Sequence, residues 1–513
     1  MQVHPTESAI HLAVAGGLGC ALGIALSSRA GLAFGGALLV GLAIARAVTQ
    51  INVARIRAAG FEMLWQTSER VRRVGRSESF ELAAELRNRD ARAARFARLR
   101  AVASPGLSVT VEPESGEVPA GGRLAVQLRI TAHGLGRHAV HGLSLELRGG
   151  PGLFEVPLTF ANPFGIEVLP RVYTRVARSS AGGRSRRVAE QPRSRPLAGD
   201  SLELRELRQH QPGDPLRKVA WKASARRGQL LVREHEREER DVVFVLLDAA
   251  IELASGTPGS SALERAVDEA ASLAVRHLHR GDDVGLGVLG RRVLTWLPPD
   301  HGSSHTLQLL EGLAHSISPV HADRSALDEA EVAQRVLDHL RPLAPDVAGS
   351  VAAYELDRVA RRAEKLLARA PFPSVEVHAG SSRERALRGY LEAFGIGSPQ
   401  RTGPDRAEVD ERLVQALTRL ASQRPEPTLV YVLSPAPTPG SRQGVMEALR
   451  RRKKRRTQLI WESIAPELSV DAPEGSAFAA ARAIVRRAEL NRSEGERALR
   501  RAGVVVEHIG RGA

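Results

Sequence analysis

The sequence is poor in cysteine and in aromatic residues. It has one cysteine among 513 residues, and its aromatic residues amount to 4%. With one thiol the chain cannot form an intramolecular disulfide, and nothing in its composition indicates an oxidising compartment. Cys20 lies inside an apolar segment, where we expect it to pack as a small hydrophobic residue.

Several common catalytic and metal-binding motifs are also missing. The chain has no Gly-x-x-x-x-Gly-Lys-Ser/Thr loop, so it should not hydrolyse ATP itself, and it has no Gly-x-Ser-x-Gly elbow. Its histidines are scattered: His133, His138 and His141 share a strand-rich stretch, and His277 and His279 lie two apart on a predicted helix. None of these spacings is that of a zinc site. We therefore predict no cofactor and assign no catalytic residue.

Acidic residues are in the minority. Lys and Arg number 73 against 58 Asp and Glu, which gives a formal net charge of +15. Such a charge favours acidic partners, anionic lipid head groups or nucleic acid. Because most of the excess is arginine, a bias that GC-rich genomes also produce, we expect no specific nucleic-acid binding.

The longest basic run lies near the C-terminus. It consists of Arg450, Arg451, Arg452, Lys453, Lys454, Arg455 and Arg456. No aromatic residue beside it could stack on bases, which argues against sequence-specific reading. Two interpretations stay open, a cluster that faces anionic lipid and a solvated helix end.

Long uncharged runs occur at the N-terminus. Residues 9–26 and 30–44 carry no formal charge, and each approaches the roughly 17 to 20 residues that a membrane-spanning helix needs. A signal peptide is the alternative, but the first residues lack Lys and Arg and two apolar runs follow rather than one. Residues 1–50 are therefore predicted as two transmembrane helices. Gly19 and Gly23, and then Gly31 and Gly35, are spaced to permit close helix approach in lipid.

Arginines set the expected orientation of this hairpin. Arg46, Arg55 and Arg57 flank the second run, whereas Arg29 alone lies in the turn. The positive-inside rule then predicts an inner-membrane protein with both termini and the soluble domains in the cytoplasm.

Residues 51–175 alternate apolar and polar positions in short runs such as LSVTVEP and RLAVQLRIT, with Pro and Gly between them. This pattern predicts an antiparallel β-sandwich, although ELRNRDARAARFARLRAV could form a helix instead. Residues 176–240 are predicted as a linker followed by a Gly-Asp motif, because residues 177–195 have almost no large apolar side chains.

From residue 241 strands alternate with helices. DVVFVLLD and TLVYVLSP are apolar runs of the kind buried in parallel sheets, and amphipathic helical stretches follow them. We predict a doubly wound α/β domain made of residues 241–325 and 426–513, interrupted by a helical insertion at 326–425.

The stretch QPGDPLRKVAWKASARRGQLLVREHE, residues 211–236, joins these parts. Gly-Asp-Pro is a sequence typical of turns. Arg217, Trp221 and Arg226 follow at intervals near one or two helical turns, so one face of a short helix could carry two cations and an aromatic ring. If this stretch has a purely structural role, it is a brace that packs the linker onto the α/β domain.

This stretch resembles the signature of domain of unknown function 58. The positions that match are Arg208, Gly213, Asp214, Arg217, Trp221, Ser224, Ala225 and Arg226; His210 stands for the usual Tyr and Val219 for the usual Ile. ANPFGIEVLPRVY and the paired N-terminal spans are also similar to that family. The resemblance implies a membrane protein with a von Willebrand factor A-like domain that works with a MoxR-type AAA+ ATPase.

Von Willebrand factor A domains often hold Mg²⁺ through Asp-x-Ser-x-Ser and further oxygen ligands. Here the segment that corresponds to Asp-x-Ser-x-Ser reads Asp248-Ala-Ala-Ile-Glu252. Thr306 is a possible counterpart of the threonine ligand, and Ser434 stands where the second Asp ligand would be expected. We therefore expect weak Mg²⁺ binding or none, with Asp248 as a remnant that caps the following turn.

Two functions remain. The first is a membrane-anchored, non-enzymatic scaffold or adaptor that docks an AAA+ ATPase and its client during assembly or remodelling of proteins. The alternative is a hydrolase that uses His210, Asp214 and Asp248, for which no nucleophile stands beside a base in a recognisable pattern.

Overall fold

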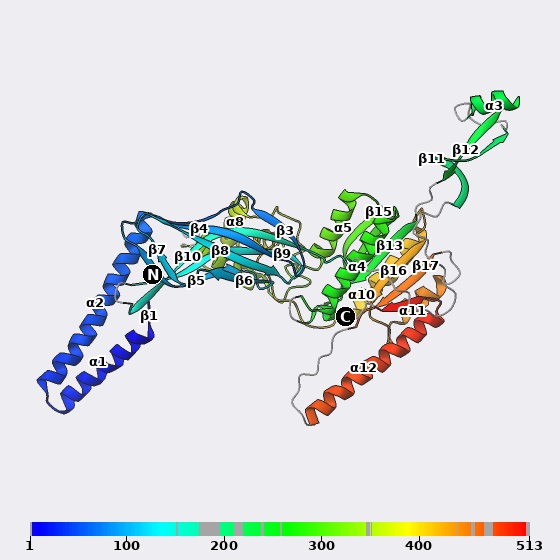
Figure 1. Ribbon diagram of the computed structural model, residues 1–513. Coiled ribbons are helices and arrows are strands. Elements are labelled where there is room, and N and C mark those ends of the chain that lie inside the picture. Colours follow the sequence, from blue (N-terminus) through cyan, green and yellow to red (C-terminus); the bar gives the residue numbers. More distant parts are fainter. Residues whose placement is uncertain are drawn as a thin grey trace. The chain divides into compact units, whose positions relative to one another are not determined.

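A computed structural model describes residues 3–149, 152–173, 195–209, 219–237, 241–256, 259–344, 349, 351–438, 440–452, 457–465 and 476–508 (Figure 1). The chain divides into two units. The first unit comprises Met1–Arg171, Ser255–Ser261 and Ile317–Gly403, and the second comprises Val172–Ala254, Ala262–Ser316 and Pro404–Ala513.

Two apolar helices, α1 (Glu7–Ala25) and α2 (Arg29–Ala59), open the first unit and pack against each other. Both are long and apolar enough to cross a membrane. Glycines make their close approach possible: a Cβ at Gly23 would lie 2.5 Å from the Leu32 nitrogen, and one at Gly35 would lie 2.5 Å from the Cys20 nitrogen. The predicted pair of helices is confirmed, and the spaced glycines form their contact.

The second half of α2 continues into the β region. Val53 and Ile56 are buried in its hydrophobic core, Arg55 pairs with Asp90 at 2.9 Å, and Thr49 lies against Gly149. The helix therefore joins the apolar hairpin to one end of the β region.

The β region consists of two sheets that enclose one core. Its strands are β1 (His4–Pro5), β2 (Phe61–Trp65), β3 (Val71–Gly75), β4 (Ser79–Asn88), β5 (Ala94–Ala103), β6 (Leu107–Glu112), β7 (Gly116–Val118), β8 (Arg123–Ala132), β9 (Gly136–Arg148) and β10 (Phe154–Leu169). One sheet has the order β1-β10-β9-β5-β7, with β3 parallel to β10, and the other has the order β2-β4-β8-β6. The remaining pairings are antiparallel. The sandwich is thus as predicted, and the helical alternative for residues 85–102 is wrong because β4 and β5 occupy them.

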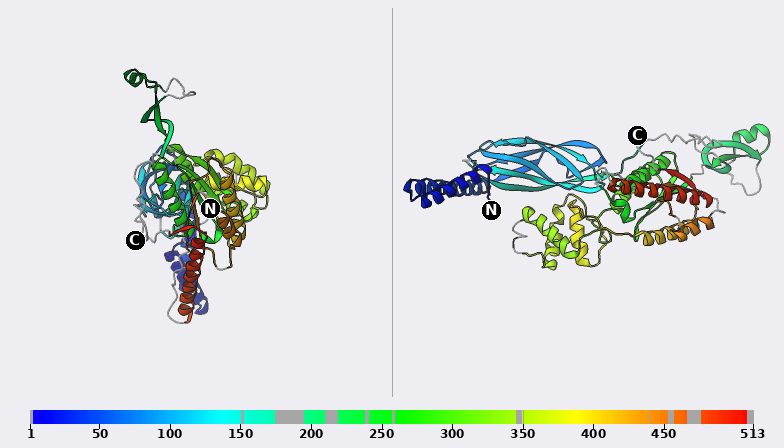
Figure 2. Two further views of the ribbon diagram at one scale, coloured as in Figure 1. Left: turned by 90° about the vertical axis from the view of Figure 1, so that its right-hand side faces the viewer. Right: turned by 90° about the horizontal axis from the view of Figure 1, so that it is seen from below.

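Part of the predicted insertion packs beside this sandwich (Figure 2). Helices α6 (Glu329–Leu343), α8 (Leu356–Leu366), η3 (Leu367–Arg369) and α9 (Ser382–Ala393) share a separate core. Ser104, the residue after β5, donates a hydrogen bond from its hydroxyl to the Gly395 carbonyl at 2.6 Å. Arg137 donates a hydrogen bond to the Pro373 carbonyl at 3.0 Å. These contacts tie the α6–α9 bundle to the sandwich.

The second unit is built on a mostly parallel sheet. Its strands, in spatial order, are β15 (Val293–Asp300), β14 (Asp283–Leu289), β13 (Val242–Asp248), β16 (Leu429–Ser434), β17 (Gln458–Ser463) and β18 (Val505–His508); only β15 runs antiparallel to its neighbour. Among the described residues, the helices that accompany this sheet are η2 (Ile251–Ala254), α4 (Ala262–His279), α5 (Ser303–Ser316), α10 (Arg406–Ser422), α11 (Gln443–Arg452) and α12 (Ser476–Arg501). All seven residues of β13 are buried, as its unbroken apolar run predicts.

Candidate functional site

The family motif lies on a ribbon and a short helix. β11 (Arg195–Gln209) pairs antiparallel with β12 (Leu231–Arg237), and α3 (Trp221–Arg227) lies between them in sequence. We name β11, α3 and β12 the ribbon module. Arg208 is on β11, and Trp221, Ser224, Ala225 and Arg226 are on α3. Gly213, Asp214 and Arg217, like His210, lie outside the described residues. α3 begins at Trp221 and holds Arg226, one of the two predicted cations; the prediction for Arg217 stays untested.

Ser224 holds the module together. Its buried hydroxyl donates to the Ala220 carbonyl at 3.0 Å and accepts from the Leu231 nitrogen at 2.9 Å. Val219 also forms a bridge with Val232, and both side chains are buried. This half of the motif therefore holds the ribbon module itself together, and the packing of the linker onto the α/β domain stays a prediction.

The other half of the motif faces outward. Trp221 is 61% exposed, and Ala225 and Arg226 are exposed on the same helix. Gly228 ends α3 in the left-handed conformation, with φ of 66°, which glycine adopts without strain. Exposed tryptophan with neighbouring arginine is the composition that binding hot spots favour.

A second cluster lies at the carboxyl end of β13. We name Asp248, Glu252, Arg406, Asp410, Ser434 and Arg442 the Asp248 cluster. Asp248 is 2% exposed; one carboxylate oxygen accepts from the Ala250 nitrogen at 3.0 Å, and the other accepts from the Ser434 hydroxyl at 2.5 Å and from Arg406. The contact with Ala250 confirms that Asp248 caps the turn after β13.

Two guanidinium groups balance the carboxylates of this cluster. Arg406 also bonds to Glu252 at 2.8 Å, while Arg442 pairs with Asp410 at 2.7 Å and lies 3.6 Å from Asp248. Burial lowers the pKa of Arg406, but the charges of Asp248 and Glu252 outweigh it and raise that pKa overall. Burial raises the pKa of Asp410, which Arg442 only partly counters.

These contacts bear on whether Asp248 and its neighbours could bind Mg²⁺. Oxygen ligands around Mg²⁺ must turn their lone pairs toward the ion, whereas the Asp248 carboxylate turns them toward Arg406 and Ser434. Thr306 donates instead to the Gly302 carbonyl at the start of α5. The carboxylate oxygens of this cluster are thus arranged to accept hydrogen bonds from arginine rather than to coordinate a divalent cation.

Sequence reasoning missed Arg406 and Arg442. They come from the start of α10 and from the segment before α11, and Arg406 is 158 residues away from Asp248. Only the rule that carboxyl ends of parallel strands form one edge could have placed Asp248 and Ser434 together.

The basic run is only partly described. Arg450 and Arg451 are exposed on α11, and Arg451 pairs with Glu447 at 2.5 Å. Arg452 ends the helix, and Lys453, Lys454, Arg455 and Arg456 lie outside the described residues. The lipid interpretation therefore stays a prediction.

Comparisons with solved structures give low similarity over the whole chain. The PapD-like domain 7 of human CEP192 matches with 16% identity and a TM-score of 0.17, over 21% of this chain and 85% of that one. WR4, an MSP family member of C. elegans, matches with 8% identity and a TM-score of 0.14, over 21% and 94%. The fold described above rests on strand pairing and not on these matches.

Comparisons of sequence are more specific. Uncharacterized protein YeaD of Bacillus subtilis (strain 168) is 32% identical over 108 residues, which is 21% of this chain and 25% of that protein. The match thus spans about a quarter of the curated relative's length. A family model described as Protein of unknown function DUF58 matches residues 206–364. The chain therefore carries a domain of the DUF58 family, as the motif around Trp221 indicated.

Proposed function

We propose that the protein is a membrane-anchored scaffold or adaptor that docks a MoxR-type AAA+ ATPase and its client proteins. The observation that carries this proposal is the division of the family motif in the ribbon module. Ser224 is buried and internal, whereas Trp221 on the same short helix is exposed. A motif that only braced its own domain would have no need of an exposed tryptophan, since burying the ring would contribute about 2 to 3 kcal/mol.

The anchor in this proposal is the α1–α2 pair. Most of both helices' apolar surface is exposed, as expected for side chains that face lipid. With Arg46, Arg55 and Arg57 on the side of the β region, the proposed location is the inner (cytoplasmic) membrane, with both termini and the soluble domains in the cytoplasm.

We further propose that the α/β domain is of the von Willebrand factor A type and works without a metal. Its sheet order and the position of Asp248 at the end of the central strand β13 support this assignment. Arg406 supplies positive charge beside Asp248, so a bound cation is not required there.

The hydrolase alternative has no comparable support. It depends on His210 and Asp214, which lie outside the described residues, and on Asp248, whose oxygens accept from Ala250, Ser434 and Arg406. We therefore propose a non-enzymatic role.

The test is affinity purification of the tagged full-length protein from solubilised native membranes, with and without a non-hydrolysable ATP analogue. Trp221→Ala should lose most of the co-purifying ATPase. The matched control is Leu230→Ala, because Leu230 is 46% exposed in the same segment and lies outside α3. Equal recovery with both variants, or no ATPase with the unaltered chain, contradicts the proposal.

A further inference from the structure

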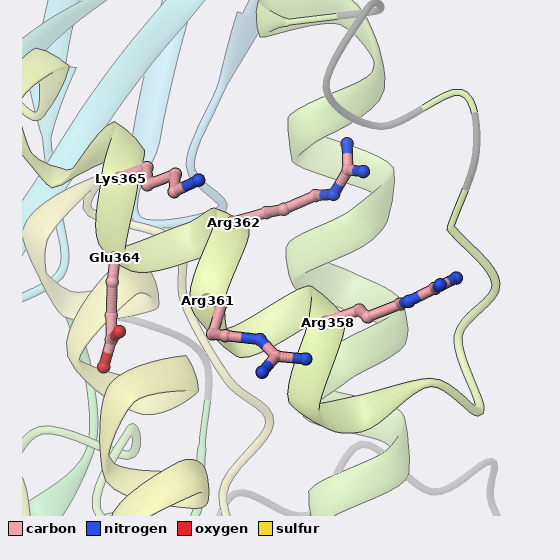
Figure 3. A pocket seen from close by; sticks show the side chains of 5 residues that line it. All are labelled: Arg358, Arg361, Arg362, Glu364 and Lys365. Atoms are coloured by element: carbon pink, nitrogen blue, oxygen red, sulfur yellow. The ribbon is translucent and has the colours of Figure 1, made fainter.

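Helix α8 carries a basic surface that the proposed function does not use. Arg358, Arg361, Arg362, Glu364 and Lys365 line an open hollow of about 720 Å³ (Figure 3). Figure 3 shows the side chains of Arg358 and Arg362 extended in the same direction, with Glu364 turned away from them. The hollow is therefore strongly cationic. We name Arg358, Arg361, Arg362 and Lys365 the α8 basic face.

The helical period places these cations together. Val359, Ala360, Ala363 and Leu366 are buried in the core of the α6–α9 bundle. Side chains three and four apart lie on one face of a helix, so the positions left to solvent include Arg358, Arg361 and Lys365, together with the carboxylates Asp357 and Glu364. Packing thus fixes α8 with its basic side outward.

Internal carboxylates neutralise only part of this charge. Arg358 pairs with Glu355 at 2.8 Å, but its side chain is 58% exposed, and such exposed pairs contribute about 1 kcal/mol or less. Arg361 and Lys365 make no hydrogen bond or ion pair with any residue that the structure describes. Both cations remain available to a partner.

The bundle contacts the sandwich near the end of β9 that is away from the apolar hairpin. On the hairpin side, Thr49 of α2 lies against Gly149, just beyond β9. On the bundle side, a Cβ at Gly395 would lie 2.6 Å from the His138 carbonyl carbon, near the start of β9. Eleven residues at about 3.3 Å each separate His138 from Gly149, roughly 36 Å. Charges in solution are screened within about 8 Å at physiological salt, so lipid head groups at the hairpin end do not reach this contact of the bundle, which disfavours them as the occupant.

The size of the surface disfavours nucleic acid. From Arg358 to Lys365 the helix rises only about 10 Å; Glu364 interrupts the positive charge, and Glu355 and Asp357 directly precede it. Proteins that bind duplexes through phosphates commonly make about 6 to 10 such contacts. A few carboxylates on a short peptide match this surface better in number and spacing.

We propose that the α8 basic face docks an acidic segment of a protein partner. The proposal goes beyond the scaffold function, since it involves a different unit of the chain and requires neither Trp221 nor an ATPase.

The test measures binding of a fluorescent poly-glutamate peptide to the full-length protein in nanodiscs of neutral lipid. Arg361→Glu with Lys365→Glu should weaken binding about tenfold or more, since two reversed charges remove over about 1.4 kcal/mol. Arg486→Glu with Arg487→Glu is the matched control, because it makes the same charge change on exposed positions of α12 and should change binding by less than about twofold.

Arg361→Lys with Lys365→Arg should retain binding, which separates loss of charge from loss of folding. Equal weakening by the α8 and α12 pairs would mean that net charge alone attracts the peptide, and would overturn the proposal. Tighter, α8-dependent binding of an RNA oligonucleotide or of anionic vesicles would overturn the choice of occupant. The purification of an ATPase through Trp221 is unaffected by either result.

Discussion

At the scale of single residues, two half-buried histidines join the sandwich to the α6–α9 bundle. The rings of His141 and His339 lie 5.0 Å apart, and His339 shares a 2.9 Å hydrogen bond with the Tyr390 hydroxyl. Burial lowers the pKa of His141 to about 4. Burial, together with the charge of His141, lowers the pKa of His339 to about 3. Both side chains are therefore neutral in the folded protein at neutral pH.

This pair predicts acid sensitivity. Below the ordinary histidine pKa of about 6.5 the unfolded chain takes up protons that the folded chain refuses, so stability falls as the pH falls. Between pH 7.5 and 5 His141 alone should cost about 2 kcal/mol. His141→Gln should flatten the pH dependence of the thermal unfolding midpoint of the solubilised protein, whereas substitution of the exposed His279 should not. A wild-type midpoint that does not change over this range contradicts the prediction.

Arg406 gives a second residue-scale prediction. Its removal leaves the buried carboxylate of Asp248 without its closest cation. Since Arg406 is partly exposed, we expect Arg406→Ala to lose about 2 kcal/mol of stability, less than for a fully buried pair. Millimolar Mg²⁺ should restore part of this loss while leaving the unaltered protein unchanged. Arg291→Ala, which removes an exposed pair with Glu408, should cost less than about 1 kcal/mol. Saturable Mg²⁺ stabilisation of the unaltered protein would contradict this account.

At the scale of elements, the hairpin depends on its glycines. A Cβ at Gly35 would lie 2.6 Å from the Gly16 carbonyl oxygen, whereas one at Gly36 would meet nothing within 4 Å. Gly35→Leu should therefore separate α1 from α2 and lower both membrane yield and thermal stability. Gly36→Leu should behave like the unaltered protein, because its side chain faces outward. If the two variants lose yield equally, the glycine contact does not hold the hairpin.

The elements also show what periodicity can and cannot predict. Unbroken apolar runs predicted β13 and β16, and alternation predicted β8. The edge strand β15 was not predicted, because Pro298 and Pro299 end it and its residues are only partly buried. The arginines in residues 85–102 are compatible both with the outer face of a strand and with a helix. The pairing of β4 with β8 and of β5 with β9 selects the strands.

At the scale of the whole molecule, contacts distant in sequence could not be predicted. Nothing in the sequence indicated that Gly395 would lie against His138, or that Arg406 would meet Asp248. The family motif did lead to Trp221 and Ser224, but not to their opposite roles, which depend on burial. The sequence therefore located the candidate sites, and the structure divided their residues between bracing and exposure.

The proposed scaffold role requires the exposed side of α3 to contact an AAA+ ATPase. The most direct measurement is photo-crosslinking in native membranes, with a photoreactive phenylalanine analogue at position 221 or at position 230. An AAA+ ATPase should be captured from position 221 and only weakly from position 230. Crosslinks from position 221 that stay within the protein's own chain would show that the motif is an internal brace, and would contradict the proposed docking role of α3.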